Sequence, residues 1–163
     1  MNNANKRKLF DSIVWSASLL FAFGLLISEA SAESTGFSAT NKTWSTECGS
    51  CHLAYPPDML PAPAWRRMLS GLDQHFGTDA SVDARAAAEI GAFLERNAGQ
   101  GRKRGSDSGT LRITETRWFV RKHDEVPTTA WKNPRVKTPA NCGACHSAAE
   151  RGDFDEDAVR IPR

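Results

Sequence analysis

The sequence predicts an all-α fold of short helices and long loops, arranged as two small lobes. Three segments beyond residue 60 carry apolar residues at helical spacing, and no segment shows the alternating pattern of a β-strand. Stretches rich in Pro, Gly and Ser separate these segments. Aliphatic side chains are sparse beyond residue 32, whereas Trp and Phe are well represented, so side chains alone would form a thin hydrophobic core.

Residues 1–32 have the pattern of a cleaved signal peptide. A short basic start at 6–8 precedes an apolar run over 13–27, and the small residues Ala30-Ser31-Ala32 form a cleavage site. The apolar run is shorter than the roughly 20 residues that a membrane-spanning helix needs. We therefore expect export to the periplasm, a mature chain that starts near Glu33, and no stable membrane insertion after cleavage. An uncleaved membrane anchor is the alternative.

The mature chain of 131 residues is long enough for one compact domain or two small lobes. The leader holds three basic and two acidic residues, so its removal lowers the formal net charge from +2 to +1. A nearly neutral chain gives no support for nucleic-acid binding.

The N-terminal lobe is predicted over 33–98. A proline-rich loop at 55–63 ends at Pro63, which fits the first turn of a helix. One face of that helix would hold Trp65, Met68, Leu69, Leu72, His75 and Phe76. A second helix is predicted over 81–97, and its inward residues would be Val82, Ala86, Ile90, Phe93 and Leu94.

A linker over 99–109 (GQGRKRGSDSG) leads to the C-terminal lobe, predicted over 110–163. A third helix is expected over 114–123, and 128–137 has the composition of a turn. Thr138 as N-cap and Pro139 behind it would open a short helix that contains residues 142–146.

The four cysteines form two copies of one motif, Cys48–His52 (CGSCH) and Cys142–His146 (CGACH), called here the first and second motif. Cys-x-x-Cys-His is the attachment signature of c-type haem. Two thiols three positions apart can form thioethers with both haem vinyl groups, and the adjacent histidine becomes the proximal iron ligand. We therefore predict two covalently attached haems, with thioethers at Cys48, Cys51, Cys142 and Cys145 and proximal ligands at His52 and His146.

Three alternatives compete for these motifs. A zinc site can use paired cysteines, but it does not call for a histidine directly after each pair. A thioredoxin-like motif would occur once, within a βαβ unit that this sequence does not show. Plain disulfides leave the repeated histidine unexplained.

Two further histidines, His75 and His123, are the candidate sixth ligands, one in each half. Methionine is the rival ligand, and Met59 in the proline-rich loop competes with His75 for the first haem. The second half has no methionine, so His123 is the predicted ligand there. We assign His75 to the first haem and His123 to the second, with the crossed arrangement as the alternative. Two bis-histidine haems would have lower potentials than methionine-ligated ones.

The chain resembles the small dihaem cytochrome c family over nearly all of its mature length. The segments that carry the resemblance are ECGSCHLAYPPDMLP from Glu47, Trp65–Gly77, Phe93–Glu95, Ile113-Thr114, Trp118–His123, the second motif and the tail Val159–Arg163. The resemblance implies an electron-transfer protein with bis-histidine haems. It also implies redox partners, namely an oxygen-binding monohaem cytochrome c and a membrane cytochrome as donor.

The leading functional hypothesis is an electron carrier and not an enzyme. An enzyme needs an iron with an exchangeable site and acid–base groups beside it. A mature chain of 131 residues around two haems leaves little room for a substrate pocket, and no histidine is left over as a distal catalyst. A small haem enzyme and a gas-binding haem protein with a displaceable sixth ligand are the alternatives.

Overall fold

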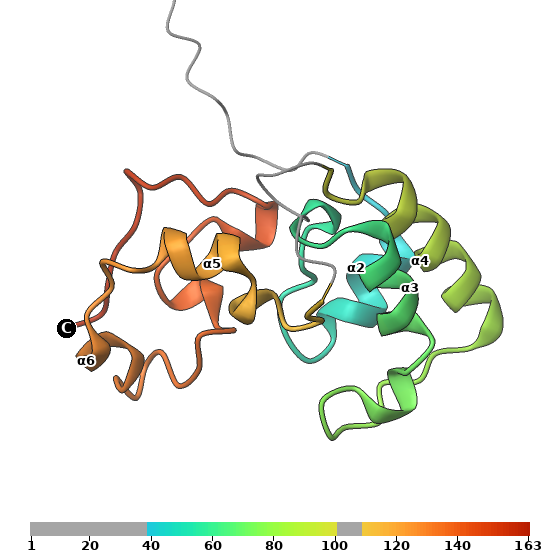
Figure 1. Ribbon diagram of the computed structural model, residues 1–163, viewed down its shortest axis with the longest axis horizontal. Helices are drawn as coiled ribbons and strands as arrows, with labels where there is room; N and C mark the ends of the chain where they lie inside the picture. The colour runs from blue at the N-terminus through green and yellow to red at the C-terminus, as the bar shows by residue number, and fades with distance from the viewer. Residues whose placement is uncertain (1–38, 101–108) are drawn as a thin grey trace, which may run out of the picture. The chain divides into compact units, whose positions relative to one another are not determined.

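The computed structural model describes residues 39–100 and 109–163, and these are folded into helices, turns and loops (Figure 1). The predicted signal peptide, the predicted start at Glu33 and residues 101–108 of the predicted linker lie outside these ranges. Within them, the structure has no strand beyond an isolated bridge between His75 and Thr78. The predicted all-α class is confirmed.

The elements follow one another as short α-helices and 3₁₀ turns (η). In the N-terminal half they are α2 (Lys42–Gly49), η1 (Pro57–Met59), α3 (Ala62–Leu69), η2 (Leu72–Gln74) and α4 (Ala84–Asn97). In the C-terminal half they are η3 (Ile113–Glu115), α5 (Arg117–Lys122), α6 (Thr128–Trp131), η4 (Cys142–Ala144) and η5 (Ala149–Arg151). None of these helices combines the length and the apolar character needed to cross a bilayer.

Side-chain caps determine where three helices begin. Asn41 accepts a hydrogen bond from the Trp44 backbone N–H at the start of α2, and Asp83 accepts one from Ala86 at the start of α4. Thr116 does the same for Phe119 at the start of α5. Each cap satisfies a backbone donor that has no partner inside its helix.

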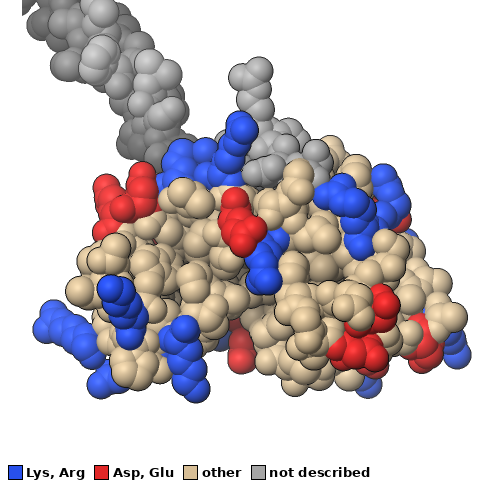
Figure 2. All heavy atoms as spheres, turned by 60° about the horizontal axis from the view of Figure 1, so that its bottom comes forward, with Lys and Arg blue, Asp and Glu red and all other residues tan. Residues whose placement is uncertain are grey.

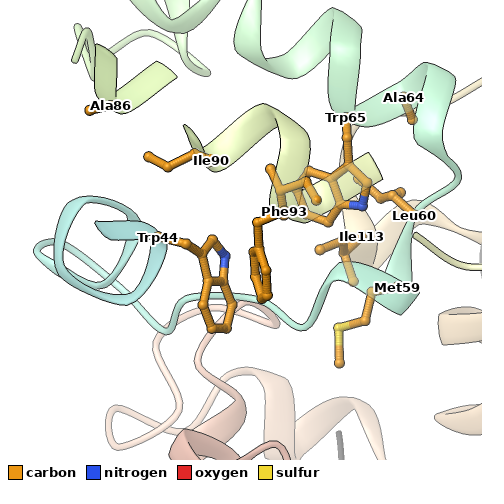
Figure 3. Packing of buried hydrophobic residues seen from close by; sticks show 10 residues of the cluster. Trp44, Met59, Leu60, Ala64, Trp65, Ala86, Ile90, Phe93 and Ile113 are labelled. Atoms are coloured by element: carbon orange, nitrogen blue, oxygen red, sulfur yellow. The ribbon is translucent and has the colours of Figure 1, made fainter. Parts of the chain in front are cut away.

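The main hydrophobic core lies where α4 packs against α2 and α3. Figure 3 shows Trp44 and Phe93 side by side in this cluster, and their ring centroids are 5.1 Å apart. Gly91 of α4 lets that helix approach α3 closely, because a Cβ at this position would lie 3.2 Å from Cδ1 of Leu69 in α3. The buried members are Trp44, Met59, Leu60, Ala64, Trp65, Ala86, Ile90, Phe93, Leu94 and Ile113.

The C-terminal half contributes few buried apolar side chains. Its buried hydrophobic residues are Ile113, Phe119, Ala130, Val136 and Ala149, and Ile113 packs into the N-terminal cluster. Few buried apolar side chains therefore stabilise the C-terminal half.

Three predicted helices are shorter than expected. The helix predicted over 81–97 starts at Ala84, because Asp83 has extended backbone and caps it. The helix predicted over 114–123 starts at Arg117, because Thr116 takes the capping role. The predicted face from Trp65 to Phe76 breaks after Leu69, and Phe76 lies outside the core, 44 % exposed at a φ of 50°.

Two local predictions in the C-terminal half were wrong. The segment 128–137 contains the short helix α6 at its start, where Pro127 precedes the first turn. The second motif lies in the 3₁₀ turn η4 and not in an α-helix. Thr138 does not cap a helix there, since its hydroxyl accepts a hydrogen bond from Ala140 N at 3.3 Å.

We expect Ile90→Ala to lower the free energy of unfolding by about 3 kcal/mol, because it leaves a cavity at the centre of the core cluster. Ile90 is only 1 % exposed. Urea unfolding of the haem-loaded protein, followed by circular dichroism, measures the loss. Arg96→Ala, at an exposed position of the same helix, is the control and should change stability by less than about 0.5 kcal/mol. Equal effects of the two substitutions would contradict the assigned core.

Candidate haem-binding sites

The first motif begins in the last turn of α2 and ends in the turn that follows. Cys48 is half-buried in the helix, whereas Cys51 and His52 are exposed beyond its end. The Ser50 hydroxyl donates to Glu47 O at 2.9 Å and so stabilises the end of the helix. The helix–turn boundary inside the motif therefore places the two thiols on different local structures.

His75 lies at the end of η2 and faces His52. The planes of the two imidazole rings are nearly parallel, 20° apart, and the ring centroids are 6.1 Å apart. The His75 N–H bonds to Leu72 O at 3.2 Å, and the Ala80 N–H bonds to the same carbonyl at 2.8 Å, so a tight turn fixes this histidine. The structure thus brings His52 and His75 together.

The second motif is held by hydrogen bonds from outside η4. Asn141 Nδ2 donates to Val136 O at 3.1 Å, and the Arg160 N–H donates to Cys145 O at 3.0 Å. The His146 N–H bonds back to Cys142 O at 2.9 Å, which closes the turn. The C-terminal tail therefore helps to shape this site.

His123 follows the last residue of α5 and faces His146. The centroids of these two rings are 6.2 Å apart, and their planes are 73° apart. Each half of the chain thus contains one facing histidine pair, formed by one motif histidine and one histidine from outside the motif.

Aromatic side chains surround the second pair. Phe119 stacks on His123 with centroids 3.9 Å apart, and Trp131 lies 5.9 Å from the same ring. Phe154 approaches His146 edge-on at 5.4 Å. The sequence interpretation gave none of these three a role in the site. The spacing of Phe119, four residues before His123 within or beside one helix, was the available signal.

The Nδ1 atoms of the four rings fall into two groups. Nδ1 of His52 is 2.7 Å from Leu53 O, and Nδ1 of His123 is 2.8 Å from Phe119 O. A carbonyl at Nδ1 orients the ring and directs the other nitrogen, Nε2, outward as a ligand. Nδ1 of His75 and of His146 is buried with no hydrogen-bond partner. The rings of His75 and His146 thus lack the carbonyl contact that orients the other two rings.

One histidine of each pair, His75 or His146, favours the neutral imidazole. Burial lowers the pKa of His75, and His52 and Arg112 lower it further. Burial also lowers the pKa of His146, with His123 acting in the same direction and Asp153 against it. A neutral imidazole keeps the lone pair that a metal ion needs.

The thiols of Cys48, Cys142 and Cys145 are not activated for redox catalysis. Burial raises the pKa of Cys48 to about 11, with the Glu47 carboxylate adding to the shift. Burial likewise raises the pKa of Cys142 to about 11 and raises that of Cys145. Thioredoxin-like catalysis requires the opposite shift. All four cysteines are free of disulfide bonds, so every thiol is available for a thioether.

Two alternatives from the sequence, a zinc site and Met59 as an iron ligand, receive no support from the described residues. A structural zinc site needs about four ligands together, and among the described residues no group of three or more His, Cys, Asp or Glu side chains forms one. Met59 is 3 % exposed and belongs to the hydrophobic core cluster (Figure 3).

The spacing of each histidine pair fits one iron atom between two imidazoles. A bond from a histidine nitrogen to a metal ion is about 2 Å long, and the ring centre lies roughly 1 Å behind that nitrogen, so two imidazoles on opposite sides of one ion have centroids about 6 Å apart. The observed 6.1 Å and 6.2 Å agree with this spacing. Thiols and facing histidines in each half therefore fit a c-type haem.

Comparison with known proteins also points to two c-type haems. The family model for dihaem cytochrome c matches residues 44–154. A dihaem cytochrome c from Shewanella baltica is 43 % identical with a TM-score of 0.66, and the match covers 75 % of this chain and 93 % of that one. A dihaem cytochrome c from Rhodobacter sphaeroides is 42 % identical with a TM-score of 0.64, covering 71 % of this chain and 98 % of that one. Comparison with curated protein sequences found no match.

The match to the family model spans both motifs and all four histidines. Membership implies two covalently bound c-type haems, as the two motifs predict, and it is consistent with electron transfer. The chain belongs to the dihaem cytochrome c family.

Proposed function

We propose that this protein is an exported electron carrier whose two haem irons are each held by two histidines. His52 and His75 would ligate the first iron, and His146 and His123 the second. The observation that carries the proposal is the pair of facing imidazoles in each half, 6.1 Å and 6.2 Å between centroids. Thioethers from Cys48, Cys51, Cys142 and Cys145 would fix the two haems.

The protein supplies ligand orientation and a partly apolar environment. A haem bound at each site would supply one-electron redox chemistry. The carbonyls of Leu53 and Phe119 hold the rings of His52 and His123 in one orientation. Stacking of Phe119 on His123 restricts that ring further. Imidazole rings that keep one orientation in both oxidation states of the iron would need little structural rearrangement during electron transfer. Fast electron carriers require such a small rearrangement.

An enzymatic function is less well supported, because the proposed ligation uses all four histidines of the chain. No imidazole is then left to act as a distal acid or base. Histidine ligation on both sides also leaves no open coordination position. The same two ring contacts support ligand pairing within each half over the crossed arrangement.

We further propose that the protein works in the periplasm after removal of residues 1–32. Its redox partners would be an oxygen-binding monohaem cytochrome c and a membrane cytochrome as donor, as the family resemblance implies. The described charges are unevenly divided: residues 39–100 hold five basic and seven acidic residues, whereas residues 109–163 hold ten and eight. Figure 2 shows Lys and Arg gathered at the lower left of one face and several Asp and Glu at the lower right. Such a division can orient a charged partner during encounter.

Carbon monoxide binding separates a carrier from an enzyme or a gas-binding protein. The haem-loaded protein is reduced and exposed to carbon monoxide while the visible absorption spectrum is recorded. We expect an unchanged spectrum, because both irons are ligated on both sides, and rapid reoxidation by an added c-type cytochrome. A stoichiometric carbon monoxide spectrum would show a displaceable ligand and would overturn the proposed function.

A further inference from the structure

Tyr55 connects the two haem-binding sites. It is the single tyrosine of the chain and lies three residues after His52. Its ring is tilted against the His52 ring, with centroids 5.1 Å apart. Its hydroxyl donates a hydrogen bond to Ala140 O at 2.9 Å, across 85 residues of sequence. One side chain thus touches a ligand of the first site and the backbone that enters the second.

The Ala140 carbonyl lies directly in front of the second motif. The Cys142 thiol points at the same oxygen, with Sγ 3.7 Å away. A thioether sulfur carries no hydrogen, so attachment of haem to Cys142 ends that donation. The Tyr55 hydroxyl then continues to hold this carbonyl.

The loop that presents Tyr55 is firmly anchored. Pro56 and Pro57 follow it and are fully buried, and Trp65 Nε1 donates to Pro57 O at 2.7 Å. Proline fixes the backbone φ and so limits the freedom of this loop. The anchored loop thus presents Tyr55 as a fixed spacer.

We propose that Tyr55 is a positioning residue that sets the separation of the two haems, through its ring at His52 and its hydroxyl at Ala140. The inference rests on the proposed histidine ligation. Electron exchange between the bound haems would move one electron from a ferrous to a ferric iron, with no bond formed or broken and no proton moved. Its rate falls steeply with distance, so loosening the second motif from Tyr55 should slow it.

The test compares Tyr55→Phe and Tyr55→Leu with Asn97→Ala in the haem-loaded protein. Asn97→Ala is the control, because it also removes a hydrogen bond from a side chain to a backbone carbonyl, but one within α4, where Asn97 Nδ2 donates to Phe93 O at 2.8 Å. The first readout is the rate of electron exchange between the haems after flash reduction of one of them. The second is amide hydrogen exchange in a peptide covering 138–146, where Ala144, Cys145 and His146 are hydrogen-bonded in the wild type.

We expect Tyr55→Phe to slow electron exchange several-fold and to speed amide exchange at 138–146, with a larger effect for Tyr55→Leu. Asn97→Ala should change neither readout. If both Tyr55 variants exchange electrons at the wild-type rate while their haems stay low-spin, the inference is wrong and the proposed ligation stands. A wild-type protein with high-spin iron would instead refute the ligation itself.

Discussion

Replacing His75 by alanine is expected to convert the first haem from low-spin to high-spin and to leave the second haem unchanged. The structure places His75 opposite His52 at 6.1 Å, and its loss removes the sixth ligand of one iron. About half of the low-spin signal should then disappear from the electron paramagnetic resonance spectrum. The reduced variant should also bind one equivalent of carbon monoxide.

Met59→Leu is the matched control, since methionine was the rival ligand for the same iron. Met59 is buried in the core cluster, and leucine replaces it there at similar volume. We expect a wild-type spin state and a small change in stability. If Met59→Leu gave the high-spin signal and His75→Ala did not, Met59 would be the ligand.

The second prediction with a large effect concerns the C-terminal half. We expect the double substitution of Cys142 and Cys145 by serine to reduce the haem content from two to one per chain and to unfold most of residues 110–163. Few apolar side chains are buried there, and Ile113 belongs to the N-terminal cluster, so the haem supplies much of the local core. Pyridine haemochrome assay and amide hydrogen exchange of the variant measure the two effects.

The same double substitution at Cys48 and Cys51 provides the contrast. The N-terminal half should keep part of its helical protection without its haem, because Ile90, Phe93 and Leu94 of α4 pack against α2 and α3. Equal loss of protection in both halves of both variants would contradict the idea that only the C-terminal half depends on its haem for folding.

Much of the N-terminal fold was predictable from the sequence because it follows local rules. The apolar spacing along α4 identified Ala86, Ile90, Phe93 and Leu94 as inward residues, and all four are buried. Pro63 lies in the first turn of α3, as its fixed φ favours. The starts of α4 and α5 were predicted about three residues too early. The side chains of Asp83 and Thr116 cap the backbone at those points, and the apolar pattern does not reveal this.

The rest of the fold was less predictable, because short turns leave a weak pattern. α2 carries few apolar residues, with Trp44 its buried member, and α6 has four residues, so neither shows a helical period. The second motif was expected in an α-helix but lies in a 3₁₀ turn whose shape depends on Asn141 and Arg160. Contacts between residues far apart in sequence determine such turns.

The candidate site could be predicted in its composition but not in its surroundings. The two motifs and the two spare histidines named eight residues, and the structure brings each motif histidine beside one spare histidine. Their roles as ligands stay a prediction. Phe154 contacts His146, and Tyr55 contacts Ala140. Both contacts join segments that are separated in the sequence, so no local sequence pattern could predict them.

Low-temperature electron paramagnetic resonance of the oxidised, haem-loaded protein tests the central claim most directly. The claim is that His52 and His75, and His146 and His123, ligate the two irons. It predicts two low-spin signals of bis-histidine type and no high-spin iron. A substantial high-spin signal in the wild type would mean an open coordination position and would contradict the assignment of the protein as a pure electron carrier.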